Sequence, residues 1–84
     1  MRIRNRLGLH ARAAARFVET ANRFRSRISA SRDGRTMDGK SILGMLLLAA
    51  SLGTVLELSA EGDDAEEALT ALVTLVESGL GEEA

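Results

Sequence analysis

The spacing of apolar residues changes repeatedly along this chain, and these changes limit the folds it can adopt more than any other feature does. Two segments repeat apolar residues every three or four positions, which predicts amphipathic helices over residues 11–23 and 65–76. Three short segments alternate apolar and polar residues, which predicts half-buried strands over residues 1–5, 26–31 and 54–60. Short strands separated by helices, within only 84 residues, predict one small α+β domain.

A hairpin and one more helix complete the predicted order. Asp33-Gly34 is a strong hairpin signal, because a type I′ turn needs positive φ at both central positions, and the returning strand is expected over residues 35–38. Ser41 stands at an N-cap position ahead of the apolar run 42–50, which predicts the additional helix.

The last helix has its own start signal. Asp63 or Asp64 is expected to cap it. Glu66 and Glu67 follow three residues later and are the expected capping-box partners. The full order is then β-α-β-β-α-β-α over residues 1–84 as a single domain. Because the strands have one polar face, we expect a four-stranded antiparallel sheet with three helices on one face and water on the other.

The helix expected over residues 42–50 is apolar on nearly every side. A domain this small cannot bury all of those sides, so part of the helix should form an exposed apolar patch, which usually marks a partner surface. No apolar run approaches the roughly 18 residues of a membrane span, and no apolar segment follows the basic residues 2–6. We therefore expect no membrane insertion, no signal peptide and a cytoplasmic location.

The composition removes several kinds of site. Without cysteine the chain has no disulfide and no thiolate ligand, and its one histidine, His10, excludes sites that need two imidazoles. The acids within residues 61–67 surround a helix start, where carboxylates are favoured, and they lack the spacing of a calcium loop. Residues 34–41 (GRTMDGKS) fit the phosphate-loop pattern, but a turn and a strand explain them better. No metal and no cofactor are expected.

Charge is divided sharply along the chain. Residues 1–42 contain all eleven basic residues and three acids, a net charge of +8, whereas residues 43–84 contain nine acids and no base. A basic surface of this kind suits an acidic or phosphorylated partner. Nucleic acid is disfavoured, because base stacking needs exposed aromatic rings and the chain has only two phenylalanines, with no tyrosine or tryptophan.

His10 is the residue best placed for chemistry. A lone histidine often caps a helix or packs in a core, and that interpretation stays open for His10. However, His10 directly precedes the first helix, whose free amides and positive dipole end favour an anion. If His10 is the cap, Arg12 can reach the space above the helix end and hold phosphate oxygens, and Arg16 extends the positive field one turn later. These residues together suit a labile phosphoryl group.

Three segments are distinctive: residues 8–18 (GLHARAAARFV), 40–45 (KSILGM) and 59–64 (SAEGDD). Together they resemble the HPr family, the histidine phosphocarriers of the bacterial phosphotransferase system. The resemblance implies the open-faced HPr sandwich and a carrier rather than an enzyme. It implies that His10 accepts a phosphoryl group on Nδ1 from phosphorylated enzyme I and passes it to a histidine of an enzyme IIA domain, with Arg12 steadying the phosphate. We expect a monomer that binds no nucleic acid.

Ser41 matches the serine that an HPr kinase/phosphorylase modifies in some members of the family. An N-cap serine explains the same residue without regulation, so both interpretations stay open. The chain departs from the family at Ala13, where proline is common, and at Leu7, where the family often has a small polar residue. Neither departure removes the imidazole or the guanidinium.

The partner surface implied by the resemblance combines basic and apolar side chains. Its expected members are Arg16, Phe17, Lys40, Leu43, Met45 and Leu46, and Arg12 and Arg23 are expected to extend its basic rim. Sugar transport and nitrogen-linked regulation, through the paralogue NPr, remain alternatives. A non-phosphorylated docking or regulatory module, controlled by serine phosphorylation, is the competing function.

Overall fold

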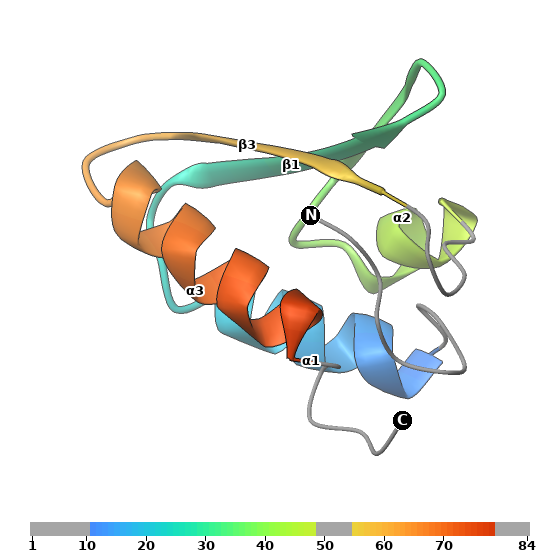
Figure 1. The fold of residues 1–84 in the computed structure, drawn as a ribbon, viewed down its shortest axis with the longest axis horizontal. Coiled ribbons are helices and arrows are strands. Elements are labelled where there is room, and N and C mark those ends of the chain that lie inside the picture. The colour runs from blue at the N-terminus through green and yellow to red at the C-terminus, as the bar shows by residue number, and fades with distance from the viewer. Residues whose placement is uncertain (1–10, 49–54, 79–84) are drawn as a thin grey trace.

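The computed structural model describes residues 11–48 and 55–78 of the chain. Its elements are α1 (Ala11–Ala21), β1 (Arg27–Arg32), β2 (Arg35–Asp38), α2 (Ile42–Leu47), β3 (Glu57–Glu61) and α3 (Ala65–Glu77). The strands form an antiparallel sheet of order β2-β1-β3, and the helices lie on one side of it (Figure 1). The predicted α+β architecture with helices on one face is confirmed. The fourth strand expected over residues 1–5 falls outside the described residues.

The sheet follows the alternation predicted for its strands. Ile28 and Ala30 of β1 are fully buried, and Ala30 pairs with Met37 of β2 and Leu58 of β3. The β1–β2 turn has φ of 51° at Asp33 and 80° at Gly34, as the hairpin prediction required. Among the described residues, β3 begins three residues later than the sequence pattern suggested.

The helices α1, α2 and α3 together close the core beneath the sheet. The inner face of α1 carries three alanines beside Phe17 and Val18, and these small residues allow close approach to α3. The buried apolar side chains are Ala13, Ala14, Phe17, Val18, Ala21, Ile28, Ala30, Met45, Leu48, Leu56, Ala68, Leu72 and Val76. Each of the three helices contributes to this core, so a shift of any one changes the packing of the others.

The start of α2 agrees with its prediction. Ser41 is the N-cap, with extended backbone angles, and its Oγ accepts a hydrogen bond of 3.0 Å from the Gly44 amide. The helix ends at Leu47, and Leu48 is its C-cap. The expected continuation to residue 50 lies outside the described residues.

The start of α3 agrees with its prediction in the position of the cap and differs from it in the bonds that the cap makes. Asp64 is the N-cap residue, but its side chain makes no capping hydrogen bond to its own helix, so the capping box expected with Glu66 and Glu67 is wrong. Its carboxylate instead accepts from the amides of Arg25 and Ser26, both at 2.9 Å, and from the Ser26 hydroxyl. Ser26 is 1% exposed, so its polar groups need an acceptor within the protein, and Asp64 supplies it.

Candidate functional site

The described part of the candidate site is the first turns of α1, which follow His10 in the sequence. His10, the expected phosphoryl acceptor, lies outside the described residues, and α1 starts at Ala11. Arg12 is exposed and Arg16 is half-buried. These two arginines are four residues apart and therefore lie on the same side of α1. The start of α1 thus carries two guanidinium groups where the helix dipole also favours an anion.

The base of α1 is fixed by the core. Ala13 and Phe17, each directly after one of the two arginines in the sequence, are fully buried. Ala13 is one of the two positions where the sequence departs from the family that it resembles, and its methyl group packs inside the protein rather than at the surface. The arginines therefore project from a helix that cannot easily rotate, because its buried face is closely packed.

Two residues expected on the partner surface are internal. Phe17 and Met45 are both 0% exposed, which corrects the expectation that a partner contacts them directly. Phe17 shares the inner stripe of α1 with Ala14 and Val18, so the helical period itself indicated burial. Met45 fills the space beneath α2. Both side chains support the surface from below.

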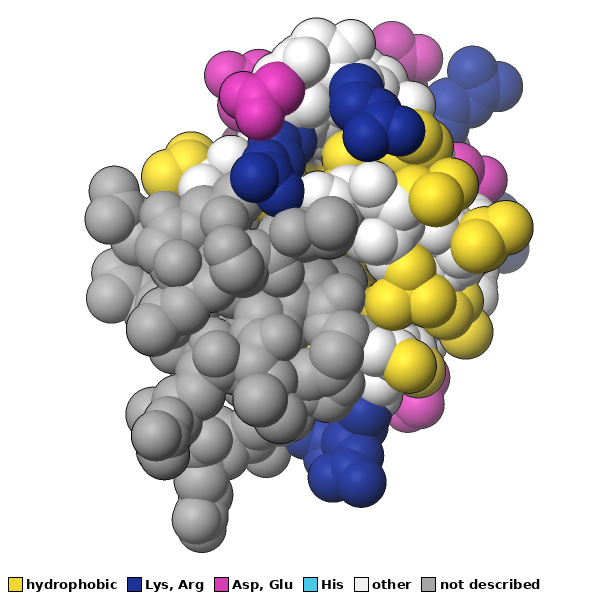
Figure 2. All heavy atoms as spheres, turned by 90° about the vertical axis from the view of Figure 1, so that its right-hand side faces the viewer, with side chains coloured by type: hydrophobic (Ala, Val, Ile, Leu, Met, Phe, Trp, Pro, Cys, Tyr) yellow, Lys and Arg dark blue, Asp and Glu magenta, His cyan; other side chains and the backbone are white. Residues whose placement is uncertain are grey.

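The exposed side of α2 is apolar. Ile42, Leu43 and Leu47 are 44%, 67% and 48% exposed, and we call these three residues the α2 patch. Figure 2 shows hydrophobic side chains gathered on this side of the molecule, with Lys or Arg side chains above and below them. Leu46 is half-buried against the core. The expected exposed apolar patch is confirmed, although Leu47 belongs to it and Met45 does not.

The helices that carry the first two motif segments, α1 and α2, pack against each other. Ser41 is half-buried at the start of α2, where the Met45 amide donates to its carbonyl over 3.0 Å. Lys40 is also half-buried, and its Nζ donates to the Phe24 carbonyl over 2.7 Å. Sequence reasoning missed this contact, because no local signal links residues sixteen positions apart.

Gly44 allows α2 to pack closely at its first turn. A Cβ at Gly44 would lie 3.3 Å from the Asp38 carbonyl oxygen and 3.3 Å from both Cβ and Oγ of Ser41. Gly44 and Met45 face inward, and Leu43 and Leu47, four residues apart, lie on the outside.

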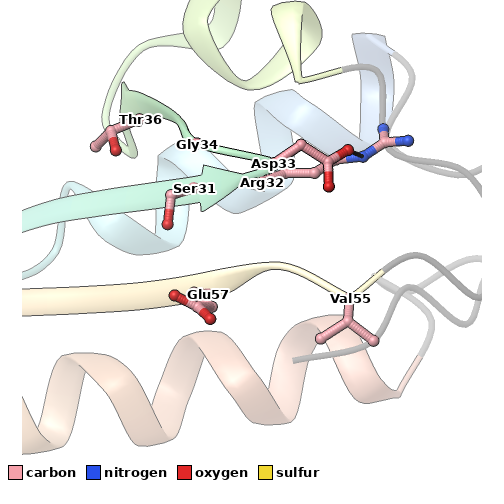
Figure 3. A pocket seen from close by; sticks show the side chains of 7 residues that line it. All are labelled: Ser31, Arg32, Asp33, Gly34, Thr36, Val55 and Glu57. Carbon is pink, nitrogen blue, oxygen red and sulfur yellow. Dashed lines mark ion pairs between the residues drawn. The ribbon is translucent and has the colours of Figure 1, made fainter.

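A separate hollow of about 430 Å³ lies beside the β1–β2 turn (Figure 3). Its lining residues are Ser31, Arg32, Asp33, Gly34, Thr36, Val55 and Glu57. Arg32 donates from Nη1 to the Leu48 carbonyl at 2.8 Å, and its Nε lies 3.5 Å from Asp33 Oδ2. The guanidinium therefore ties the hairpin to the end of α2. Residues 35–38 form β2, which confirms that the phosphate-loop pattern spans a turn and a strand.

Within the two described ranges, no helix has the length and apolar character needed to cross a membrane.

Comparison with known proteins identifies the family. A family model described as "PTS HPr component phosphorylation site" matches residues 1–78. The phosphocarrier protein HPr of Cupriavidus necator is 45% identical over 78 residues, which is 93% of this chain and 88% of that protein. A crystal structure of HPr from Thermoanaerobacter tengcongensis is 52% identical and covers 100% of this chain and 94% of its own, with a TM-score of 0.95.

The Crh protein of Bacillus subtilis is similar as well. The structure of Crh from Bacillus subtilis, described as a catabolite repression protein and a dimer with a swapped domain, is 43% identical and covers 94% of this chain and 91% of its own, with a TM-score of 0.81. The family match over most of the sequence and the shared fold lead to one conclusion: the chain belongs to the HPr family, the phosphocarrier proteins of the phosphotransferase system, and is a carrier rather than an enzyme.

Proposed function

We propose that this chain accepts a phosphoryl group on His10 from phosphorylated enzyme I and passes it to a histidine of an enzyme IIA domain. The observation that carries the proposal is the family match over residues 1–78, which includes His10 directly before a helix that bears Arg12 and Arg16. Arg12, Arg16 and the positive end of α1 favour a phosphoryl group carried just ahead of this helix in the sequence.

The transfer exchanges one bond to phosphorus for another. The lone pair of His10 Nδ1 attacks the phosphorus held by enzyme I, a nitrogen–phosphorus bond forms, and the bond to the donor breaks. In the second step the histidine of the enzyme IIA domain attacks the same phosphorus, and His10 becomes the leaving group. Arg12 neutralises oxygen charge during both steps, and Arg16 adds to the field. The carrier is thus restored after each cycle.

The α2 patch, together with a basic rim, is the proposed docking surface for both partners. The rim consists of Arg12, Arg16, Arg23 and Lys40. Arg23 is available to a partner because its ion pair with Glu19 is 3.8 Å long, and both side chains are largely exposed, at 68% and 76%. Surface pairs of this kind contribute little and exchange readily. Acidic side chains around an apolar centre are the expected complement on the partner.

Phosphorylation of Ser41 is the proposed means of regulation, with an HPr kinase/phosphorylase as its agent. A phosphate at this N-cap would add about two negative charges next to Ile42 and the rest of the α2 patch. Such charge opposes docking to an acidic partner, while the first turn of α2 tolerates it. The similarity to Crh, a catabolite repression protein, supports keeping a second candidate function, a docking module controlled through this serine.

Several coarser properties belong to the same proposal. We propose that residues 1–5 add the fourth strand to the sheet, that residues 1–84 act as a single domain, and that the chain works as a monomer in the cytoplasm without a cofactor and without binding nucleic acid. The swapped dimer described for Crh is the alternative state. Size-exclusion chromatography with light scattering at several concentrations distinguishes the two.

The transfer itself tests the proposal against the docking-module alternative. The chain is phosphorylated with enzyme I and radiolabelled phosphoenolpyruvate, separated from the donor, and mixed with an enzyme IIA domain. A carrier loses the label to the enzyme IIA domain within the mixing time, and a matched sample without that domain keeps it. A chain that binds the domain with equal affinity before and after treatment, and never transfers label, is the docking module instead.

A further inference from the structure

One peptide group in the loop between α1 and β1 lies between opposite charges. Lys40 Nζ donates to the carbonyl oxygen of Phe24 over 2.7 Å, and the amide of Arg25 donates to Asp64 Oδ2 over 2.9 Å. That carbonyl and that amide belong to the same planar peptide unit. An ammonium group therefore holds the negative end of the peptide dipole while a carboxylate holds its positive end.

The carboxylate side of this arrangement is rigidly built. Besides Arg25, Asp64 accepts hydrogen bonds from the amide and the hydroxyl of Ser26, which is buried. Gly62, with φ of 145°, brings the chain so close that a Cβ there would lie 2.5 Å from Ser26 Oγ. The start of α3 is thus fastened to the loop that contains the Phe24–Arg25 peptide.

The ammonium side is equally fixed through its backbone. The Gly39 amide donates to the Ile28 carbonyl over 2.8 Å, and the Lys40 amide donates to Asp38 Oδ1 over 2.9 Å. A Cβ at Gly39 would lie 2.6 Å from Ile28 Cγ2, so residues 39–41 lie tightly against β1. Lys40 therefore leaves an anchored backbone, directly before Ser41, to reach the loop.

We infer that the Phe24–Arg25 peptide couples the start of α3 to the start of α2, with Lys40 and Asp64 acting together as positioning residues for Ser41 and the α2 patch. A cation that binds the carbonyl polarises the peptide unit, so the amide of the same unit becomes a stronger donor. The Lys40 ammonium and the Asp64 carboxylate therefore each strengthen the hydrogen bond that the other makes to this peptide. The coupling is a property of the fold and goes beyond the proposed phosphoryl transfer, because it holds whether or not His10 is a carrier.

Amide spectroscopy tests this coupling at both ends. Lys40→Met removes the cation and leaves the Arg25 amide its acceptor on Asp64. We therefore expect hydrogen exchange of that amide to become about two- to threefold faster, because its hydrogen bond loses only the polarisation that the cation supplies. Arg23→Met is the matched control, since it removes a nearby exposed cation. Equal exchange rates for the Arg25 amide in Lys40→Met and Arg23→Met would overturn the inference.

The reverse direction uses the other charge. Asp64→Asn should shift the amide resonances of Ser41 and Gly44, although its own contacts lie in the α1–β1 loop, whereas Asp63→Asn should leave them in place. A double-mutant cycle of Lys40→Met and Asp64→Asn should give a loss of unfolding free energy smaller than the sum of the single losses. Unshifted Ser41 and Gly44 resonances in Asp64→Asn, or strictly additive losses, would show that the two ends act independently.

Discussion

The helices α2 and α3 both begin at a residue that commonly caps helices, but the two side chains bind different parts of the chain. Ser41 caps its own helix through the Gly44 amide, three residues on, and next to it lies the exposed α2 patch. Asp64 leaves its own helix uncapped and binds the loop at Arg25 and Ser26, 39 and 38 residues earlier in the chain. One cap is local and accessible; the other has become a tertiary contact.

The difference separates a functional helix start from a structural one. A local cap can be modified with an effect confined to its first turn, which suits a regulatory residue next to a docking surface. A cap that joins distant segments cannot be changed without loosening the fold. Substitutions at each helix start should therefore differ in how much stability they cost.

Replacing Asp64 should cost the most stability. Asp64→Ala leaves the amides of Arg25 and Ser26 and the buried Ser26 hydroxyl without their acceptor. We expect Asp64→Ala to lower the melting temperature more than the other variants do. Thermal unfolding monitored by circular dichroism measures this change. Asp63→Ala, which removes an exposed neighbouring acid, is the control. Equal melting temperatures for the two variants would place the start of α3 in the same class as a surface residue.

Acid should reproduce the effect of that substitution. The Ser26 hydroxyl, and then the Arg25 amide, hold the pKa of Asp64 below its ordinary value of 3.8. A lowered folded pKa gives stability that is present above the unfolded value and is lost as pH falls through the folded one. Denaturant unfolding of the wild type and Asp64→Asn between pH 7 and pH 2 should therefore show a constant difference at neutral pH that shrinks below about pH 4. A difference that widens toward low pH would contradict this assignment.

Ser41→Ala should have a smaller and local effect. Loss of one N-cap hydrogen bond costs about 1 kcal/mol of unfolding free energy, and aspartate at the same position keeps the capping oxygen. Ser41→Asp should therefore retain wild-type stability but weaken docking of an acidic partner, since it adds a charge beside the α2 patch. Urea unfolding measures the effect on stability, and the KM of the enzyme IIA domain for the phosphorylated chain measures the effect on docking. If Ser41→Asp lost as much stability as Ser41→Ala, side-chain capping would not explain the start of α2.

Leu43→Ser should change stability least. Its side chain is 67% exposed, so the unfolding free energy should stay within about 0.5 kcal/mol of wild type. If the α2 patch docks partners, the same change should raise the KM for transfer by roughly five- to tenfold, the loss typical of a contributing interface residue. Val55→Ser, at an apolar residue 52% exposed before β3, is the matched control. A KM equal to that of the control would remove the α2 patch from the docking surface.

Features set by neighbouring residues were predictable from the sequence. The Asp33-Gly34 turn, the Ser41 cap and the inner stripe of α1 each depend on contacts within four residues, and all three are confirmed. The period of α1 also indicated that Phe17 is buried, and it was a better guide than the family resemblance, which placed Phe17 on the partner surface.

Features set by distant contacts were not predictable. Nothing near Asp64 shows that a buried serine 38 residues away needs an acceptor. In α2 nearly every residue is apolar, so periodicity cannot decide which side faces out. The packing of α2 against α1 and β2 decides it: Met45 is buried and Leu47 stays exposed. His10 lies outside the described residues, so its place in the site remains a prediction.

The central claim, that His10 carries a phosphoryl group, is tested most directly by intact mass. The chain is incubated with enzyme I, magnesium and phosphoenolpyruvate, and its mass is measured before and after mild acid. We expect the addition of one phosphoryl group that mild acid removes and that is missing in His10→Ala. A stable added mass, or equal modification of His10→Ala, would contradict it, as would no modification by any of a panel of enzyme I proteins that includes the nitrogen-linked type.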